Sequence, residues 1–105
     1  MYTRLDPRHL VRLRVSLRGT DGSGHPFAQT VFTRDVSARG ARLSGAPPLL
    51  EPASVVKVEY RGKGARFRVV WVGGMVNDEV GLLSLEPSRC IWGKPLPGKP
   101  VSANV

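Results

Sequence analysis

Hydrophobic and polar residues alternate strictly over residues 11–18 of this chain. Four aliphatic residues share one side of that segment: Val11, Leu13, Val15 and Leu17. The residues that alternate with them, through Arg18 at the end of the segment, are three arginines and a serine. A repeat of two residues is typical of a β-strand with one buried face, and it does not fit the 3.6-residue repeat of a helix. The pattern therefore predicts a half-buried strand over residues 11–18.

Further short segments along the chain carry similar strand signals. They cover residues 27–34, 40–43, 56–60, 66–71 and 79–85. Turn-forming residues separate most of these segments, and three prolines make residues 45–53 a loop, because proline cannot donate a hydrogen bond to a β-ladder. Six short strands separated by turns predict an all-β fold, a small six-stranded antiparallel barrel.

The length of 105 residues is that of one domain. Within it we predict a flexible N-terminal arginine segment at residues 1–9, the barrel at residues 10–93, and a tail at residues 94–105 that is irregular or disordered. Prolines in the tail disfavour a C-terminal helix. No signal peptide and no apolar run of about 20 residues is present, so we expect a cytoplasmic protein that does not insert into a membrane.

The charge of the chain indicates an anionic partner. Sixteen basic residues stand against eight acidic ones, which gives a net charge of +8, and twelve of the basic residues are arginines. The planar fork of an arginine fits phosphate oxygens and the O6/N7 edge of guanine, whereas lysine acts as a point charge. Weak, unspecific attraction to any polyanion is the simpler alternative.

Signals for catalysis and for metal binding are absent from the sequence. His9 and His25 have no paired cysteine or carboxylate at the spacing of metal ligands. Cys90 is the single cysteine, so it cannot form an internal disulfide, and it has no obvious base partner. No phosphate-binding loop or nucleophile elbow is found. We therefore expect a non-catalytic protein that needs no metal or cofactor.

Two short motifs carry a resemblance to a known family. An Arg-x-x-x-Arg motif spans Arg4 to Arg8, ahead of the first predicted strand, and an Asp-x-Ser-x-x-Gly motif spans Asp35 to Gly40, after the second. In this order the motifs resemble those of the PilZ domain, the bacterial receptor for cyclic di-GMP. Further segments are similar to the opening and closing strands of that family, and they include residues 10–15, 67–72, 80–82 and 92–93. The resemblance covers about residues 4–93.

The resemblance implies a PilZ-like split barrel of six strands that binds cyclic di-GMP on its outer surface. It implies that Arg4 and Arg8 bind phosphates and guanine edges, while Asp35 accepts hydrogen bonds from guanine N1–H and N2–H. Ser37 would donate a hydrogen bond to the ligand, and Gly40 would allow a close backbone approach. These pairings suit the donors and acceptors of guanine and phosphate.

For two of the expected site residues, Arg12 and Trp71, the sequence allows more than one role. Arg8 and Arg12 also form an Arg-x-x-x-Arg pair, so this second register stays open, although Pro7 and the start of the strand favour Arg4 with Arg8. Trp71 could stack on a guanine, as an aromatic residue does in some PilZ domains. Its parity with Phe67 instead favours the core or the barrel rim. We expect Trp92 to close the barrel end as an apolar plug.

The sequence thus predicts a cyclic di-GMP receptor module that acts in second-messenger signalling. Binding would order the arginine-bearing N-terminus, and a downstream protein would read the changed surface. One alternative is a PilZ-like docking module that binds protein but no nucleotide. Another is a small basic barrel that binds RNA or single-stranded DNA; the seven aromatic residues form no obvious stacking platform, which counts against nucleic acid as a partner.

Overall fold

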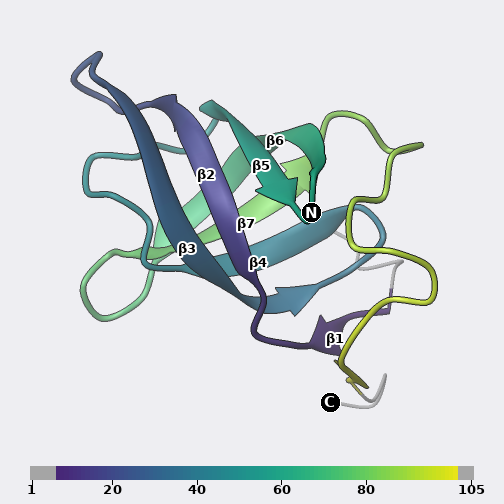
Figure 1. Cartoon of the computed structure of the whole chain (residues 1–105). Coiled ribbons are helices and arrows are strands. Elements are labelled where there is room, and N and C mark those ends of the chain that lie inside the picture. Colours follow the sequence, from purple (N-terminus) through teal and green to yellow (C-terminus); the bar gives the residue numbers. More distant parts are fainter. Residues whose placement is uncertain (1–6, 102–105) are drawn as a thin grey trace.

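The computed structural model describes residues 7–101, in which β-strands are the only regular elements (Figure 1). The eight strands are β1 (His9–Leu10), β2 (Arg14–Thr20), β3 (Pro26–Val36), β4 (Gly40–Ser44), β5 (Val55–Tyr60), β6 (Lys63–Gly73), β7 (Glu79–Ser84) and β8 (Lys99–Pro100). The predicted all-β fold is therefore confirmed, and the described residues contain no C-terminal helix, as expected. None of them forms a helix that could cross a lipid bilayer.

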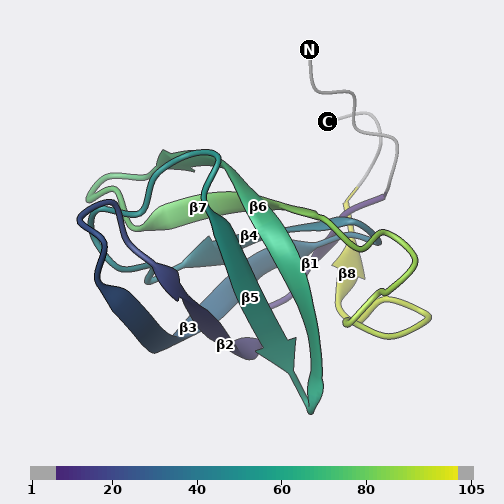
Figure 2. The same cartoon turned by 90° about the horizontal axis from the view of Figure 1, so that it is seen from above.

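Six strands close into an antiparallel barrel, which confirms the predicted architecture (Figures 1 and 2). The order around the barrel is β2-β5-β6-β7-β4-β3, and pairing of β2 with β3 closes the ring. Strands β1 and β8 extend the sheet beyond β3, where β1 pairs with both β3 and β8. Closure leaves few unpaired edges, and it gives every barrel strand one inner and one outer face.

The inner faces of the six strands form one apolar core. Seven of its side chains are completely buried: Leu17, Val31, Val36, Leu43, Val58, Val69 and Val80. Trp92 is buried against this core, with its ring centroid 5.8 Å from that of Tyr60 and 6.3 Å from that of Phe67. Trp92 therefore acts as the apolar plug expected from the sequence.

The first barrel strand begins three residues later than the alternation predicts, at Arg14 instead of Val11. The cause is Thr33 on β3, whose hydroxyl donates to the Val11 carbonyl oxygen at 2.6 Å and accepts from the Leu13 amide at 2.8 Å. The Thr33 side chain thus serves two backbone groups of residues 11–13, while the Thr33 amide still donates to the Leu13 carbonyl oxygen at 2.9 Å and the Val11 amide to the Arg34 carbonyl oxygen at 3.4 Å. The apolar side chains of Val11 and Leu13 still pack against the core, so the pattern predicted burial correctly but not the strand.

The remaining boundaries shift by a few residues. Strand β3 extends to Val36 instead of ending at residue 34, and β6 begins at Lys63 instead of residue 66. The β5–β6 turn is shorter than the sequence suggests because Arg61 and Gly62 both adopt positive φ, at 51° and 82°. Two residues in this conformation are enough to close a hairpin with the natural twist of the strands.

The tail contributes one short strand where the sequence predicts irregular structure. Strand β8 pairs with β1, and the amide of Val101 donates to the carbonyl oxygen of Arg8 at 2.8 Å. The imidazole Nδ1 of His9 lies 3.2 Å from the carbonyl oxygen of Pro97. These contacts connect the described part of the tail to the segment that carries Arg8.

The role of Thr33 predicts a measurable loss of stability in the variant Thr33→Val. Thr33 is 1% exposed, and removal of its hydroxyl leaves the Val11 carbonyl and the Leu13 amide without their partner. We expect the free energy of unfolding to fall by about 1–3 kcal/mol in a denaturant titration. Thr30→Val is the matched control, since Thr30 is exposed on the same strand, and it should change stability by less than about 0.5 kcal/mol. Equal losses in both variants would contradict the role of the Thr33 hydroxyl.

Candidate functional site

A β-bulge on β3 turns Asp35 away from the core. Thr33 pairs with Leu43 of β4, but Asp35 pairs with Arg42, the next residue of β4, so that Arg34 is an extra residue on β3. Thr33 faces inward with a buried side chain. Without the bulge, Asp35 would face inward too, because side chains two residues apart share one face of a strand. The extra residue instead directs Asp35 to the outer side of the barrel.

A second bulge does the same for Trp71 on β6. Val69 pairs with Leu82 of β7, whereas Trp71 pairs with Gly81, so that Val70 is the extra residue. Val69 is completely buried, but Trp71 is 40% exposed. The expectation of a core position for Trp71, offered by the sequence beside the barrel rim, is therefore wrong. It rested on strand parity, and the bulge reverses that parity between residues 69 and 71.

The two bulges align four outward-facing residues in one row across the barrel. Asp35 pairs with Arg42, Arg42 with Gly81, and Gly81 with Trp71, so the row crosses β3, β4, β7 and β6 in turn. Gly81 is required in this row, because a Cβ atom there would overlap the indole Nε1 of Trp71. The five-membered ring of the indole therefore lies directly over the backbone of Gly81.

This row forms part of a pocket of about 300 Å³ on the outer surface of the barrel. Such a volume is at the small end of the range for ligand pockets, roughly 300–1,000 Å³. Five residues that the sequence identifies as candidates line it: Arg8, Asp35, Ser37, Gly40 and Trp71. The remaining lining residues include Arg42, Val70 and Gly81. The fold thus brings together two motif segments and a tryptophan that are far apart in the sequence.

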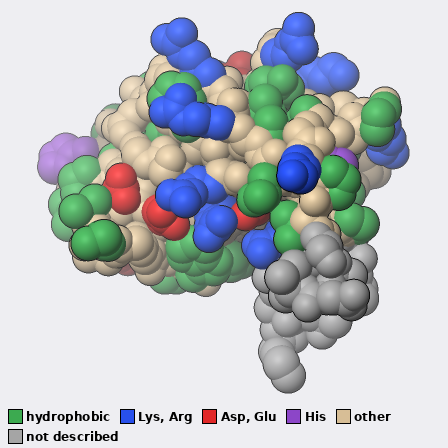
Figure 3. Space-filling view, turned by 90° about the horizontal axis from the view of Figure 1, so that it is seen from below, with side chains coloured by type: hydrophobic (Ala, Val, Ile, Leu, Met, Phe, Trp, Pro, Cys, Tyr) green, Lys and Arg blue, Asp and Glu red, His purple; other side chains and the backbone are tan. Residues whose placement is uncertain are grey.

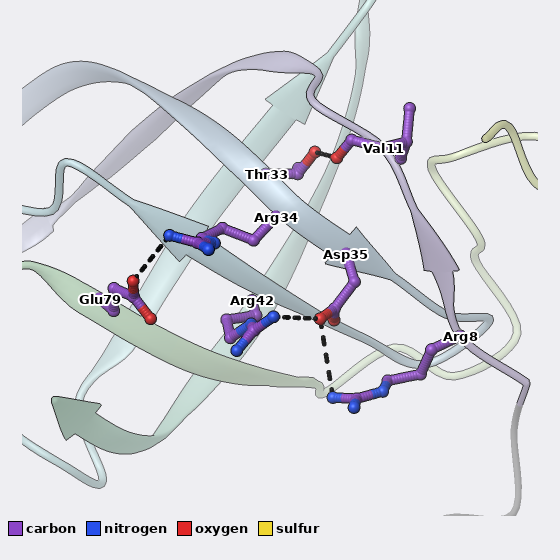
Figure 4. Close-up of polar contacts among 7 residues, drawn as sticks. All are labelled: Arg8, Val11, Thr33, Arg34, Asp35, Arg42 and Glu79. Carbon is purple, nitrogen blue, oxygen red and sulfur yellow. Dashed lines mark hydrogen bonds and ion pairs between the residues drawn. The ribbon is translucent and has the colours of Figure 1, made fainter. Parts of the chain in front are cut away.

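Asp35 lies between two arginines at the edge of the pocket (Figure 4). Its Oδ2 is 3.1 Å from Nη2 of Arg42 and 3.7 Å from Nη1 of Arg8. The side chain of Asp35 is only 4% exposed, whereas those of the two arginines are about one-third exposed. The three groups together carry one net positive charge, which suits an anionic ligand.

The hydrogen bonding of this trio is incomplete. Asp35 Oδ2, Arg8 Nε and Arg42 Nε are buried, and none has a hydrogen-bond partner of good geometry in the protein. The contacts of Asp35 with the two arginines are therefore ion pairs. The contact with Arg42 is at hydrogen-bonding distance, and the contact with Arg8 is slightly longer. Buried polar atoms in native proteins almost always have a partner, and exceptions often occur at functional sites. Each of these atoms has almost no accessible surface, so a bound molecule reaches it only if the side chain moves.

Arg8 reaches the pocket because it directly precedes β1, which pairs with the end of β3 at Asp35. The β1 residue that pairs with Asp35 is Leu10. The hydrogen bond from Val101 to the Arg8 carbonyl holds the same backbone from the other side. Arg4, the other arginine of the motif, lies outside the described residues.

The second motif builds the turn between β3 and β4. The Ser37 amide donates to the Gly40 carbonyl at 3.0 Å, which closes the turn. Gly40 approaches β7 closely, because a Cβ at this position would lie 2.9 Å from the carbonyl oxygen of Leu82. Ser37 is buried and lines the pocket beside the turn. The glycine is therefore needed for close packing of the strands that form the pocket wall.

Arg12 does not belong to this pocket. Its guanidinium lies over the ring of Phe32, 3.8 Å from the ring centroid, in a cation–π contact. Arg12 is not among the residues that line the pocket. In the register that pairs Arg8 with Arg12, therefore, only Arg8 lies at the pocket.

Two residues outside the expected site matter for its geometry. From the sequence, Arg42 is only one of three arginines, with Arg66 and Arg68, that could widen the basic surface around a ligand, and Gly81 has no predicted role. Each follows from the cross-strand register with its neighbours, and that register is not visible in the sequence of a single strand. Within the described part of the chain, no three His, Cys, Asp or Glu side chains are grouped as a metal site. Basic side chains outnumber acidic ones on the face drawn in Figure 3, in line with the net charge.

The packing of the indole on Gly81 predicts that Gly81→Ala displaces Trp71. The new methyl group would occupy the position of the indole nitrogen, so the ring has to leave the pocket floor. In a ¹H–¹⁵N spectrum we expect a large shift of the Trp71 indole signal and an unchanged signal for the buried Trp92. Gly73→Ala is the matched control, because its Cβ would lie 3.6 Å from the same indole, an ordinary contact. A Trp71 signal unaffected by Gly81→Ala would contradict this geometry.

Comparison with known proteins does not assign the chain to a family. Neither a scan against protein-family models nor a search of curated proteins finds a match to it.

Proposed function

We propose that this chain is a non-catalytic receptor domain for cyclic di-GMP, as its sequence resemblance to the PilZ domain implies. The observation that carries the proposal is the shared pocket of Arg8, Asp35, Ser37, Gly40 and Trp71. These residues come from two sequence motifs and a distant strand. Their convergence on one outer surface is expected for a ligand site, whereas unrelated surface residues would be scattered.

The charges of the pocket suit both parts of a guanine nucleotide. Asp35 can accept hydrogen bonds from guanine N1–H and N2–H, since these two donors lie side by side on the base. Arg8 offers donors for phosphate oxygens, and such contacts are charge-assisted and often bidentate. Such a ligand would give the buried, unpartnered atoms of Arg8, Arg42 and Asp35 hydrogen-bond partners if it shifts these side chains. Release of Arg8 from its longer contact with Asp35 would free it for a phosphate.

Trp71 supports the same ligand through its flat, partly exposed ring. The indole lies over Gly81 at the pocket floor, where a base can stack on it. Stacking of a base on an aromatic side chain contributes about 1–3 kcal/mol. The pocket is about large enough for one base with part of its backbone, so the rest of a dinucleotide would extend over the adjoining surface.

Binding would be transmitted through the N-terminal segment. Arg8 lies next to β1, which is only two residues long and pairs with β3 and β8. A ligand that binds Arg8 would fix this segment against the barrel, and we propose that a downstream protein in the bacterial cytoplasm recognises the closed form. The expected role of Arg4 would belong to the same step.

The first test is isothermal titration of the full chain with cyclic di-GMP at physiological salt, with GMP as the control ligand. Saturable binding at micromolar or lower concentration, with no comparable heat from GMP, is the expected result. The fitted stoichiometry would also give the number of ligands bound. Absence of binding would reject the receptor function and favour a PilZ-like docking module for proteins.

The variants Arg8→Ala and Arg12→Ala test which arginine binds the ligand. Both changes remove one positive charge within the same short segment, but only Arg8 lines the pocket. We expect Arg8→Ala to weaken cyclic di-GMP binding at least tenfold, about 1.4 kcal/mol, with a nearly unchanged thermal melt. Arg12→Ala should bind like the wild type to within about threefold. A stronger effect of Arg12→Ala would instead support the second register of the motif.

A further inference from the structure

Arg42 lines the pocket but belongs to neither of the two sequence motifs. It is the second residue of the row that runs from Asp35 through Arg42 and Gly81 to Trp71. Strands in a sheet lie about 4.8 Å apart, so the backbones of Arg42 and Trp71 are about 10 Å apart, with Gly81 between them. Gly81 has no side chain, and Arg42 and Trp71 on either side of it both line the pocket.

Asp35 fixes one end of the Arg42 guanidinium. The Nη2 atom lies 3.1 Å from Asp35 Oδ2, while Nε is buried without a hydrogen-bond partner (Figure 4). A guanidinium is a rigid fork, so an ion pair at one nitrogen orients the others. Arg42 therefore presents its remaining donors to the pocket in a defined direction. Arg8 is less constrained, since its distance to the same oxygen is 3.7 Å.

The order of these groups matches the order of polar atoms around guanine. The N1–H and N2–H donors lie next to O6, and O6 lies next to N7. A base stacked on Trp71 that presents its donors to Asp35 would turn its O6 and N7 acceptors toward Arg42. Asp35 and Arg42 are themselves in contact, as two groups that bind adjacent edges of one base must be.

We propose that Arg42 selects guanine by donating hydrogen bonds to O6 and N7 of the base that stacks on Trp71. This inference rests on the proposed function and assigns a specific role at the same site. Adenine carries an amino group where guanine carries O6, so the donors of Arg42 would face another donor. Arg42 thereby complements Asp35, and the two side chains together recognise both polar edges of guanine.

The test compares cyclic di-GMP with its 7-deaza analogue, in which a C–H group replaces the N7 acceptor of each guanine. The analogue keeps O6, N1–H, N2–H and both phosphates, so only the contact to N7 is lost. We expect the wild-type chain to bind cyclic di-GMP about tenfold more tightly than the analogue, the effect of one charge-assisted hydrogen bond. In Arg42→Lys this preference should fall to less than about twofold, because lysine keeps the charge but loses the fork.

Two further variants complete the experiment. Arg42→Gln should also lose the preference, and it replaces Arg42→Lys if that variant does not fold, as judged by its thermal melt. Arg14→Gln is the matched control, since Arg14 is exposed on β2 and does not line the pocket. It should keep the wild-type preference for cyclic di-GMP.

The outcomes separate this inference from the function on which it rests. A wild-type chain that binds neither ligand rejects the receptor function and this inference with it. A wild-type chain that binds both ligands equally, or an Arg42→Lys variant that keeps the full preference, overturns the role of Arg42 alone. If Arg42→Lys weakens both ligands by the same factor, Arg42 acts through Asp35 or the phosphates, and the proposed contact with N7 is rejected.

Discussion

The two-residue alternation of a β-strand, and its interruption at Arg34 and Val70, is the constraint on which the candidate site depends. In a closed barrel, strict alternation would direct Asp35 and Trp71 into the core. A buried carboxylate there would be costly, and an indole would displace other core side chains. One extra residue in each of two strands moves both groups outside. The bulges leave the core intact, since beyond them Val36 on β3 is again buried and Val72 on β6 again packs against the core.

The charge balance around Asp35 follows from that arrangement. A carboxylate with little solvent access has to be compensated by positive groups, and Arg8 and Arg42 supply that compensation from two different segments. Because both arginines keep about a third of their side-chain surface exposed, they remain accessible to a ligand. The pocket therefore holds one buried carboxylate and two arginines, of which Arg42 lies closer to that carboxylate than Arg8 does.

Thr33 and the tail determine how Arg8 is presented. Through its hydroxyl, Thr33 satisfies the Val11 carbonyl and the Leu13 amide, so residues 11–13 keep only part of their ladder with β3 before β1 pairs with the end of β3. Strand β8 pairs with the free edge of β1. A buried threonine and two residues of a proline-rich segment thus hold an arginine beside Asp35. In the proposed receptor, this strand of two residues is the element that a ligand would stabilise.

The sequence by itself determined the class of fold, the six barrel strands to within a few residues, the turns and the apolar plug Trp92. Local alternation and turn chemistry act within a few residues of one another, so a linear pattern contains them. The two motifs likewise identified Arg8, Asp35, Ser37 and Gly40 as candidates. Only the tertiary structure decided that Trp71 faces outward, that Arg42 and Gly81 belong to the pocket, and that Arg12 does not. These outcomes depend on bulges and on register between strands distant in sequence, which no single strand encodes.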